Sequence, residues 1–307
     1  VWVNLSRLMD KLLLIDIGGT HMRHAIASAS SNEITEINKE SFSTKNFDNT
    51  LQDLIQRNNI NVLIISAAGP KIGNKISMTN RNYVFDSVKL KEKFNLKECY
   101  LLNDWEAIAH SYEYVSENIK IIKDGQSFNN NTLFLGPGTG LGAALAIGNE
   151  VVIPTEIGNT NNTIKLFNSN FTFNIEKELT LENIISGTGI SYLYKQKTGS
   201  ELAAEDIFKK FLHKDNDAEE IINGFIKCLA QTLSDLSLTF IPGNGILLAG
   251  SLIRSLYPHM ISDVFKDNYL GTKNGIHRDI LEMVSIGVIT KEKTPLYGNL
   301  GFYKKLI

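Results

Sequence analysis

The sequence has almost no net charge and no long apolar run, and each shortage excludes a class of partner. Its 31 basic and 33 acidic side chains leave a formal net charge of −2. This balance gives no electrostatic reason to expect nucleic acid or an anionic membrane as a partner. No apolar run approaches the roughly 20 residues that a membrane-spanning helix requires. We therefore expect a globular protein without a nucleic-acid or membrane partner.

Cysteine is also scarce, and histidine forms no ligand pattern. The two cysteines, Cys99 and Cys228, both lie in apolar stretches, which favours buried thiols in a reducing cytoplasm. No C-x-x-C or H-E-x-x-H spacing occurs, and the six histidines are scattered. A metal held by histidine or cysteine is therefore not expected.

The chain of 307 residues is long enough for two domains, each with its own core. Its 43% hydrophobic and 21% charged residues are ordinary for a globular protein. Twice the sequence passes from an apolar strand through a glycine-rich loop into a second strand and then into α/β elements. This duplication predicts two similarly built lobes with a cleft between them, where binding sites are common.

The glycine-rich loop Gly136–Gly142 follows the predicted strand Thr132–Leu135. Its four glycines remove Cβ atoms and permit positive φ angles, so that successive N–H groups can form a concavity for phosphate oxygens. A tight turn without a ligand is the alternative. No lysine follows a glycine cluster at the Walker A spacing, which excludes P-loop NTPases.

A dinucleotide-binding dehydrogenase is the rival interpretation of this loop, because Gly138-x-Gly140-x-x-Ala143 satisfies the relaxed fingerprint. That fingerprint must open a helix. Only five residues separate Gly142 from the next turn at Gly148-Asn149, after which Glu150–Pro154 reads as a returning strand. The loop therefore joins two strands, which argues against NAD.

A second glycine-rich stretch, Asp16-Ile17-Gly18-Gly19-Thr20, has the same hairpin context, between the predicted strands Lys11–Asp16 and Arg23–Ala29. Its glycines would let the backbone approach a phosphate, and the Thr20 hydroxyl could donate to one. Asp16 could hold Mg²⁺, directly or through water, since this ion prefers one or two carboxylates together with substrate phosphates. The alternative is that Asp16 is only a turn residue at a strand end.

The stretch Cys99–Ala107 reads as a buried strand that ends at Asn103 and Asp104, with a helix starting at Trp105. Ligands of open α/β folds sit at the carboxyl ends of strands, which would place both polar side chains toward a substrate. The alternative is that Asp104 merely caps the helix.

The remaining predicted elements frame these stretches. The pair Gly73-Asn74 predicts a hairpin turn. Apolar runs predict strands over Val62–Ser66, Ala143–Ile147 and Gly245–Ala249, and helical spacing predicts helices over Thr50–Asn58, Glu182–Lys197, Ala203–His213, Ala218–Phe240 and the tail after Pro295.

With these residues in view, the chain from Leu13 to Phe302 resembles the bacterial glucokinase family, within the actin-like, hexokinase-type ATPases. Each matching segment alone is weak evidence, but five in the family's order are specific. They are Asp16–Thr20 with Arg23, Ala68–Pro70 with Met78-Thr79-Asn80, Leu102–Ala107, Gly136–Gly142 and Ala249-Gly250-Ser251.

The resemblance implies an α/β, two-lobed actin-like (ribonuclease H-like) ATPase fold with a central cleft. Its small domain would comprise 9–103 and 291–307, its large domain 104–290, and a homodimer is a family expectation. The implied cofactors are ATP and Mg²⁺, with the metal held by Asp16 through water. The implied nucleotide contacts are Asp16, Ile17, Gly18, Gly19, Thr20, Gly138, Thr139, Gly140 and Gly250.

The implied reaction is ATP-dependent phosphorylation of a hexose, in the first place glucose to glucose 6-phosphate, with Asp104 as general base. The implied sugar ligands are Asn80, Asn103, Glu156, Asn159 and Glu182.

One motif departs from the family. Thr155–Asn159 stands where the family shows E-G-G-H, so that Ile157 replaces a glycine and Asn159 a histidine. An amide can still donate to a sugar hydroxyl but carries no charge, and the isoleucine changes the shape of the pocket. A kinase for another hexose or an amino sugar, and a sugar sensor without catalysis, therefore remain as alternatives.

Overall fold

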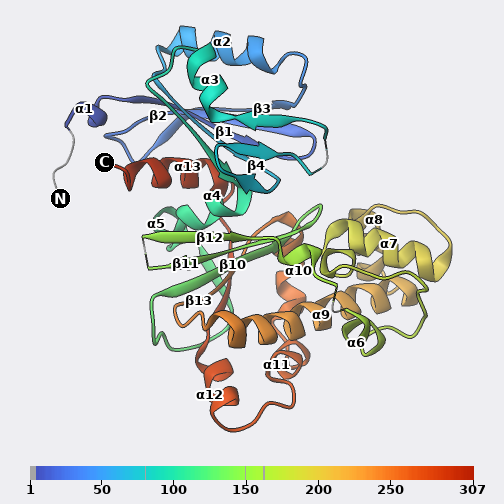
Figure 1. The fold of residues 1–307 in the computed structure, drawn as a ribbon. Coiled ribbons are helices and arrows are strands. Elements are labelled where there is room, and N and C mark those ends of the chain that lie inside the picture. Colours follow the sequence, from blue (N-terminus) through green and yellow to red (C-terminus); the bar gives the residue numbers. More distant parts are fainter. Residues whose placement is uncertain (1–4, 80, 149, 162) are drawn as a thin grey trace. The chain divides into compact units, whose positions relative to one another are not determined.

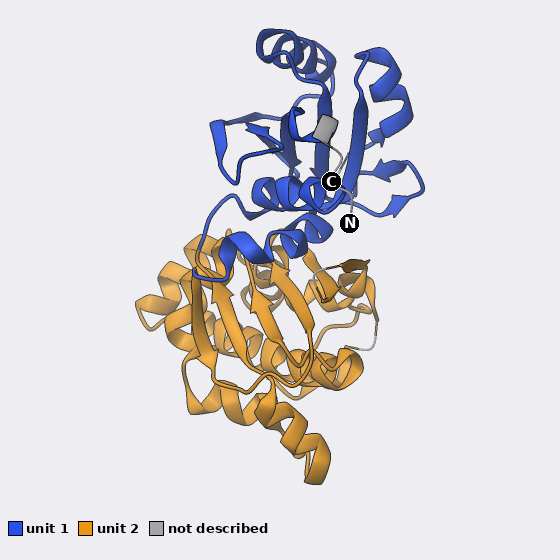
Figure 2. Cartoon of the chain, turned by 90° about the vertical axis from the view of Figure 1, so that its left-hand side faces the viewer, with its two compact units in different colours: residues 1–117, 291–307 blue, residues 118–290 orange. Residues whose placement is uncertain are grey.

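The computed structural model describes residues 5–79, 81–148, 150–161 and 163–307. It divides into two compact units, which Figure 2 colours separately: unit 1 comprises residues 1–117 and 291–307, and unit 2 comprises 118–290. The sequence analysis placed the change of domain at residue 104. The units change at residue 118 instead, because α4 (Asp104–His110) and α5 (Tyr112–Val115) pack against α13 (Thr294–Lys304) of unit 1.

Unit 1 is built on a five-stranded sheet with the order β3-β2-β1-β4-β8, as the upper part of Figure 1 shows. β1 pairs antiparallel with β2 and parallel with β4, which pairs parallel with β8. The strands are β1 (Lys11–Ile17), β2 (His21–Ser28), β3 (Ile34–Ser41), β4 (Val62–Ala67) and β8 (Glu98–Asn103).

Alternate residues of β1 face opposite sides of this sheet, and both sides are covered. Leu13 and Ile15 belong to an apolar cluster with α2 (Phe47–Asn58) and α3 (Ser87–Lys93). Leu12 belongs to a second cluster with α13 on the other face. This two-sided burial explains why β1 reads as a continuous apolar run.

Helix α13 is held to the sheet and to α4 by close backbone and buried polar contacts. A Cβ on Gly298 would lie 1.6 Å from the Ala107 carbonyl oxygen, so the two helices touch through their backbones. Asn299 Nδ2 donates to the Ile15 carbonyl at 2.8 Å, and Tyr303 Oη donates to Asp10 at 2.6 Å. The last helix is therefore an integral part of unit 1.

A small three-stranded sheet follows β4, with β5 (Lys71–Ile72), β6 (Lys75–Ser77) and β7 (Val84–Asp86) in the order β5-β6-β7. β5 and β6 pair antiparallel around Gly73-Asn74, as the sequence predicted. Phe85 of β7 packs edge-on against Phe47 at 5.4 Å between ring centroids.

Unit 2 is built on a six-stranded sheet with the order β12-β11-β10-β13-β14-β9. β10 pairs antiparallel with β11 and parallel with β13, so the core order β12-β11-β10-β13 repeats the β3-β2-β1-β4 order of unit 1. The strands are β9 (Ile119–Lys123), β10 (Asn131–Pro137), β11 (Leu141–Ile147), β12 (Val151–Thr155), β13 (Gly245–Leu248) and β14 (Ile286–Ile289).

Helices of unit 2 pack on this sheet around one apolar cluster, with the long α9 (Asn216–Phe240) at its centre. The remaining helices are α6 (Ile164–Asn168), α7 (Gly187–Thr198), α8 (Ala204–Leu212), α10 (Ser251–Met260), α11 (Asp263–Leu270) and α12 (Gly275–Met283), with α1 (Leu5–Leu8) in unit 1.

The predicted helix over Glu182–Lys197 is wrong at its start. The structure has a 3₁₀ turn, η2 (Leu181–Asn183), and α7 begins only at Gly187. Ile184 is the C-cap of η2, and Ser186 caps α7, because its Oγ accepts from Gly189 N at 2.9 Å.

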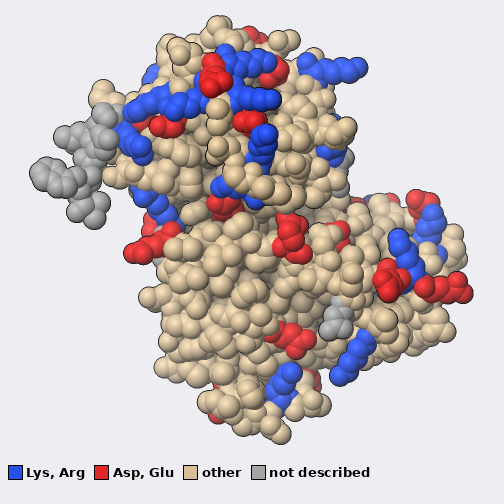
Figure 3. Space-filling model, viewed as in Figure 1, with Lys and Arg blue, Asp and Glu red and all other residues tan. Residues whose placement is uncertain are grey.

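Charged side chains of both signs are interspersed over unit 1 on the face shown in Figure 3. Exposed ion pairs contribute to this mixing, such as Lys93 with Asp48 at 2.6 Å and Lys91 with Glu98 at 3.2 Å. Exposed pairs of this kind each contribute little to stability. Within the described part of the chain, no helix combines the length and apolar character needed to span a membrane.

Candidate active site

The first glycine hairpin consists of Gly18, Gly19 and Thr20, which connect the paired ends of β1 and β2. Gly18 N donates to the His21 carbonyl at 3.0 Å and closes the hairpin. Arg81 reaches it from outside, and its Nε donates to the Gly19 carbonyl at 2.9 Å. The loop is therefore three residues long, shorter than the stretch between the predicted strands Lys11–Asp16 and Arg23–Ala29. The guanidinium group of Arg81 holds its backbone in place.

Asp16 lies in β1, two residues before this hairpin, and is 4% exposed. Arg23 Nη1 donates to its Oδ2 at 2.9 Å across the β1–β2 pair. Burial raises the pKa of Asp16, and the charge and hydrogen bond of Arg23 oppose this increase. Arg23 therefore compensates for part of the cost of burying this carboxylate.

The donor set around Asp16 fits one mode of magnesium binding. Among the described residues, no group of three or more His, Cys, Asp or Glu side chains could hold a metal ion, which argues against a site made of protein ligands alone. A single carboxylate beside a glycine hairpin fits an ion that takes most of its ligands from phosphates and water. Asp16 is the residue that would hold Mg²⁺ in this way.

Asn103 and Asp104 lie at the junction of β8 and α4, where Asn103 is the helix cap. Its Oδ1 accepts from Trp105 N at 2.9 Å and from Glu106 N at 3.3 Å, while the Glu106 carboxylate accepts from Asn103 N at 3.1 Å. This is a complete capping box. The capping role therefore belongs to Asn103, and Asp104 is the first helical residue.

The side chain of Asn103 also holds a neighbouring turn. Its Nδ2 donates to the Gly69 carbonyl at 3.0 Å, and Gly69 has a φ of +153° with no room for a Cβ, which would lie 2.0 Å from the Ser77 carbonyl oxygen. Lys71 extends this arrangement, with its Nζ 3.3 Å from Glu106 Oε1. Asp104 therefore stands on a braced strand–helix junction.

The second glycine hairpin, Gly138-Thr139-Gly140, connects β10 and β11. Gly136 and Gly142 pair with each other inside the strands, so the loop is tighter than the predicted Gly136–Gly142. Gly138 N donates to the Gly140 carbonyl at 2.8 Å. A Cβ added to Gly138 would meet nothing within 4 Å, and both Gly138 and Thr139 are exposed. This tip leaves room for the close approach of a ligand.

The start of α7 holds this second hairpin. Gly187 N donates to the Gly138 carbonyl at 2.7 Å, and Thr188 Oγ1 donates to the Thr139 carbonyl at 2.6 Å. Gly250 lies on its other side with a φ of +115°, and a Cβ there would be 3.5 Å from the Pro137 carbonyl oxygen. Gly250 also precedes the first turn of α10.

Three of the predicted sugar ligands lie on neighbouring turns of unit 2. Glu156 precedes the 3₁₀ turn η1 (Ile157–Asn159), whose last residue is Asn159, and Asn159 Nδ2 donates to Glu156 Oε2 at 3.5 Å. Glu182 lies in η2, which packs against η1. Partial desolvation raises the pKa of Glu156, and the negative charge of Glu182 adds to this increase, whereas the Asn159 hydrogen bond lowers it.

The structure distributes the other predicted residues as follows. Ile157 packs against the apolar core of unit 2. Asn80 lies outside the described residues. Asp16, Asn103 and Asp104 belong to unit 1, whereas Gly138–Gly140, Glu156, Glu182 and Gly250 belong to unit 2.

Sequence reasoning missed four residues that support these loops, namely Lys71, Arg81, Ser186 and Thr188. The first two act through partners 35 and 62 residues away, and no local pattern signals such contacts. Ser186-Gly187-Thr188-Gly189 did carry a signal, because two glycines and a capping serine are unusual inside a helix.

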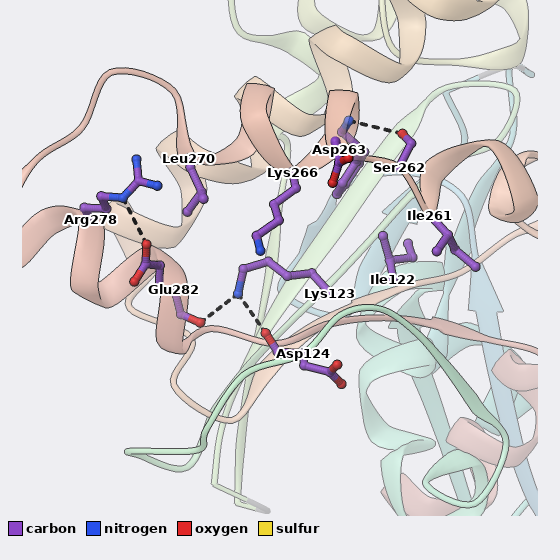
Figure 4. Close-up of a pocket in the computed structure, with 11 residues that line it drawn as sticks. Ile122, Lys123, Asp124, Ile261, Ser262, Asp263, Lys266, Leu270, Arg278 and Glu282 are labelled. Atoms are coloured by element: carbon purple, nitrogen blue, oxygen red, sulfur yellow. Dashed lines mark hydrogen bonds and ion pairs between the residues drawn. The ribbon is translucent and has the colours of Figure 1, made fainter.

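A cavity of about 680 Å³ lies elsewhere in unit 2, between β9, α11 and α12 (Figure 4). Lys123 Nζ donates to the carbonyls of Asp124, Glu282 and Val284 at 2.7–2.9 Å, so its three donors are used. Burial lowers the pKa of Lys123 to about 8. Three basic and three acidic side chains line the cavity, so its lining favours no ligand charge.

Comparison with known proteins identifies the family. The glucokinase family model matches residues 13–305. Glucokinase of Mesorhizobium japonicum is 27% identical over 94% of this chain and 89% of the relative, and glucokinase of Colwellia psychrerythraea is 26% identical over 96% of both chains.

Solved structures show the same fold. A glucokinase from an Antarctic psychrotroph superposes with a TM-score of 0.76 at 24% identity, covering 96% of this chain and 99% of the other. The glucokinase of Balamuthia mandrillaris, solved in complex with glucose, has a TM-score of 0.76 at 18% identity over 96% and 94%. The resemblance and the fold class inferred from the sequence are thereby confirmed. The chain belongs to the glucokinase family and is a sugar kinase.

Proposed function

We propose that this sugar kinase phosphorylates glucose at O6 with ATP, and that Asp104 is the general base. The observation that supports this assignment is the junction of β8 and α4. Asp104 follows directly on the carboxyl end of β8, which pairs parallel with β4, and ligands of open α/β folds bind at such strand ends. Asn103 caps α4, and Asp104 Oδ1 also accepts from Trp105 N at 3.1 Å, which holds the carboxylate at this end of the strand. A base of this kind accepts the hydroxyl proton and typically contributes about 10²–10⁴-fold.

The two glycine hairpins supply the phosphate-binding part of the proposal. Phosphoryl transfer depends mainly on positioning the reactants and on stabilising charge on the phosphoryl oxygens. The N–H groups of Gly18 and Gly138 close the two turns, and the N–H groups of the residues that follow them, Gly19-Thr20 and Thr139-Gly140, would serve this purpose, with Gly250 on the adenosine side. Bound Mg²⁺, held by Asp16, would neutralise phosphate charge.

Glu156, Asn159 and Glu182 would bind sugar hydroxyls, together with Asn103 and Asn80. Carboxylates accept hydrogen bonds from hydroxyl groups, and the amide of Asn159 both donates and accepts. Asn159 stands where the family shows histidine, and this difference favours a second candidate, a kinase for another hexose or an amino sugar. Both candidates share Asp104 and the two hairpins.

Release of ADP from Mg-ATP, measured against a panel of hexoses and amino sugars, tests the proposal. We expect glucose to give the highest kcat/KM, and sugar-independent ATP hydrolysis to be far slower than sugar-dependent turnover. Asp104→Asn should lower kcat by about 10²–10⁴-fold while sugar affinity stays within a few-fold.

The outcomes separate the candidates. Preference for a different sugar, lost in Asp104→Asn, would replace glucose but keep the mechanism. Full activity of the variant would refute the role of Asp104. Binding of ATP and sugar without any turnover by the wild type would support a sensor instead.

A further inference from the structure

One carboxylate oxygen of Glu182 lies between the two loops of unit 2 that the proposed function assigns to different substrates. Leu141 N, at the end of the second hairpin, donates to Glu182 Oε2 at 3.4 Å. A Cβ added to Gly140 would lie 2.6 Å from this oxygen, and a Cβ on Gly158 of η1 would lie 3.3 Å from it. The side chain therefore fits against glycines of both loops.

The backbone around Glu182 connects the same two loops. Leu181 N donates to the Thr160 carbonyl at 2.9 Å, next to the η1 turn. Five residues beyond Glu182, Gly187 N and Thr188 Oγ1 donate to carbonyls of the second hairpin. Ser186 Oγ donates to the Glu182 carbonyl at 2.6 Å and holds the short segment together.

The loops also touch directly. A Cβ on Gly158 would lie 2.4 Å from the Leu141 carbonyl oxygen, so η1 rests on the backbone of β11 where the hairpin ends. Displacement of Glu182 or of Leu141 therefore changes both loops. All of the residues named in these contacts belong to unit 2.

We infer that Glu182 is a positioning residue for the second hairpin, and that it couples the sugar-binding turn to this phosphate-binding loop. The inference rests on the proposed function for the identity of the two ligands. A sugar hydroxyl that donates to Glu182 fixes the carboxylate in position. The fixed carboxylate then holds Leu141 N and orders the hairpin. Because the hairpin is already ordered, it loses less conformational entropy when the nucleotide binds. Because coupling free energy is reciprocal, nucleotide must tighten sugar binding by the same factor.

A pair of alanine substitutions in the hairpin tests the coupling. Gly140→Ala places a methyl group against Glu182 Oε2, the flexible end of that side chain, so the carboxylate should move while the fold persists. Gly138→Ala is the matched control, because its methyl group meets nothing within 4 Å. Calorimetry measures glucose affinity in the absence of nucleotide, and thermal unfolding checks that both variants are folded.

We expect Gly140→Ala to weaken glucose binding by about tenfold, which is a typical size for coupling between sites. Gly138→Ala should leave it within about twofold, although it lies in the same loop. Unchanged glucose affinity in a folded Gly140→Ala variant would overturn the inference, and so would equal losses in the two variants.

The reciprocal arm measures Mg-ADP affinity without sugar. Glu182→Ala should weaken it several-fold, whereas Glu182→Gln, whose amide oxygen can still accept from Leu141 N, should retain most of it. If Glu182 only binds sugar, neither substitution should change the affinity for Mg-ADP, and that result would refute its role as a positioning residue. If the wild type binds no hexose, the proposed function fails, and this arm alone decides whether Glu182 positions the hairpin.

Discussion

The two glycine hairpins occupy the same place in their sheets, but different chemistry holds them. Each has three loop residues between a central strand and its antiparallel neighbour, and in each the first glycine N–H closes the turn. In unit 1 the fixing groups are charged, namely Arg81 on the Gly19 carbonyl and the Asp16–Arg23 pair. In unit 2 they are the backbone of Gly187, the hydroxyl of Thr188 and the carboxylate of Glu182.

This difference suggests a division of labour. A buried carboxylate beside the first hairpin can attract a cation, and the nearby arginine limits the cost of its charge. The second hairpin is held by neutral donors from the start of α7, and the carboxylate beside it, Glu182, accepts from the backbone N–H of Leu141 and has no arginine partner of the kind that Arg23 provides for Asp16 among the contacts described above. The same hairpin geometry thus serves a charged site in one unit and a site of backbone donors in the other.

Asp16→Asn should have the largest effect of the changes that break this comparison. The amide keeps the shape and an acceptor for Arg23 but loses the charge. We expect kcat to fall by about 10²–10³-fold, as for other removals of electrostatic stabilisation, and the Mg²⁺ concentration for half-maximal activity to rise. Metal titrations of initial rate test this, with glucose affinity as the control. An unchanged Mg²⁺ requirement would contradict the role of Asp16.

Acidification should lower the stability of unit 1, because one of its histidines is buried. His110 of α4 is buried beside Phe302, and its Nδ1 lies 3.4 Å from Lys305 Nζ. Burial lowers its pKa to about 4, and the positive charge of Lys305 adds to this. The folded state binds the His110 proton more weakly than the unfolded chain does. The free energy of unfolding is therefore highest above about pH 6.5, and it falls by about 3 kcal/mol as the pH is lowered toward 4.

Trp105 lies in α4 of unit 1, so the change in its fluorescence reports the unfolding of unit 1. Denaturant titrations at pH 7 and pH 4.5 should show this loss in the wild type and a smaller one in His110→Gln. Identical pH dependence in the two proteins would refute the assignment.

Removing one fixing group from each hairpin compares them directly. Arg81→Met deletes a charged donor to Gly19, and Thr188→Val deletes a neutral donor to Thr139. Because charged hydrogen bonds contribute about 1.5–3 kcal/mol and neutral ones about 1 kcal/mol, we expect the KM for ATP to rise about tenfold or more in the first variant and about fivefold in the second. A larger effect of Thr188→Val would reverse the proposed division of labour.

The smallest expected effect concerns pH and the sugar. Burial and the charge of Glu182 raise the pKa of Glu156, so this carboxylate becomes protonated at a higher pH than an ordinary glutamate, about 4.3. A protonated Glu156 accepts fewer hydrogen bonds from hydroxyl groups. On acidification, the KM for sugar should therefore begin to rise at a higher pH than an ordinary glutamate would give, while the KM for ATP stays flat. Parallel changes in both KM values would contradict this assignment.

The strands that carry both hairpins could be predicted because they are buried on both faces and read as apolar runs. The loop bounds could not, since Gly136 and Gly142 look like loop residues in sequence but pair within the sheet. The helices α10, α11 and α12, between Gly250 and β14, were not predicted. Residue types at strand ends indicated Asp16 and Asp104. The supports from Lys71 and Arg81 depend on contacts that only the fold creates.

Unit 2 is inserted within the sequence of unit 1, and this order has a consequence for folding during synthesis. Helix α13, which touches α4 through Gly298 and reaches Ile15 through Asn299, leaves the ribosome only after all of unit 2. Domains generally fold as they emerge, but unit 1 cannot complete its buried face at that stage. The nascent first unit, with its glycine hairpin and Asp104, must therefore wait for the last helix. Unit 1, which carries the Asp16–Arg23 pair, is therefore the last unit to be completed.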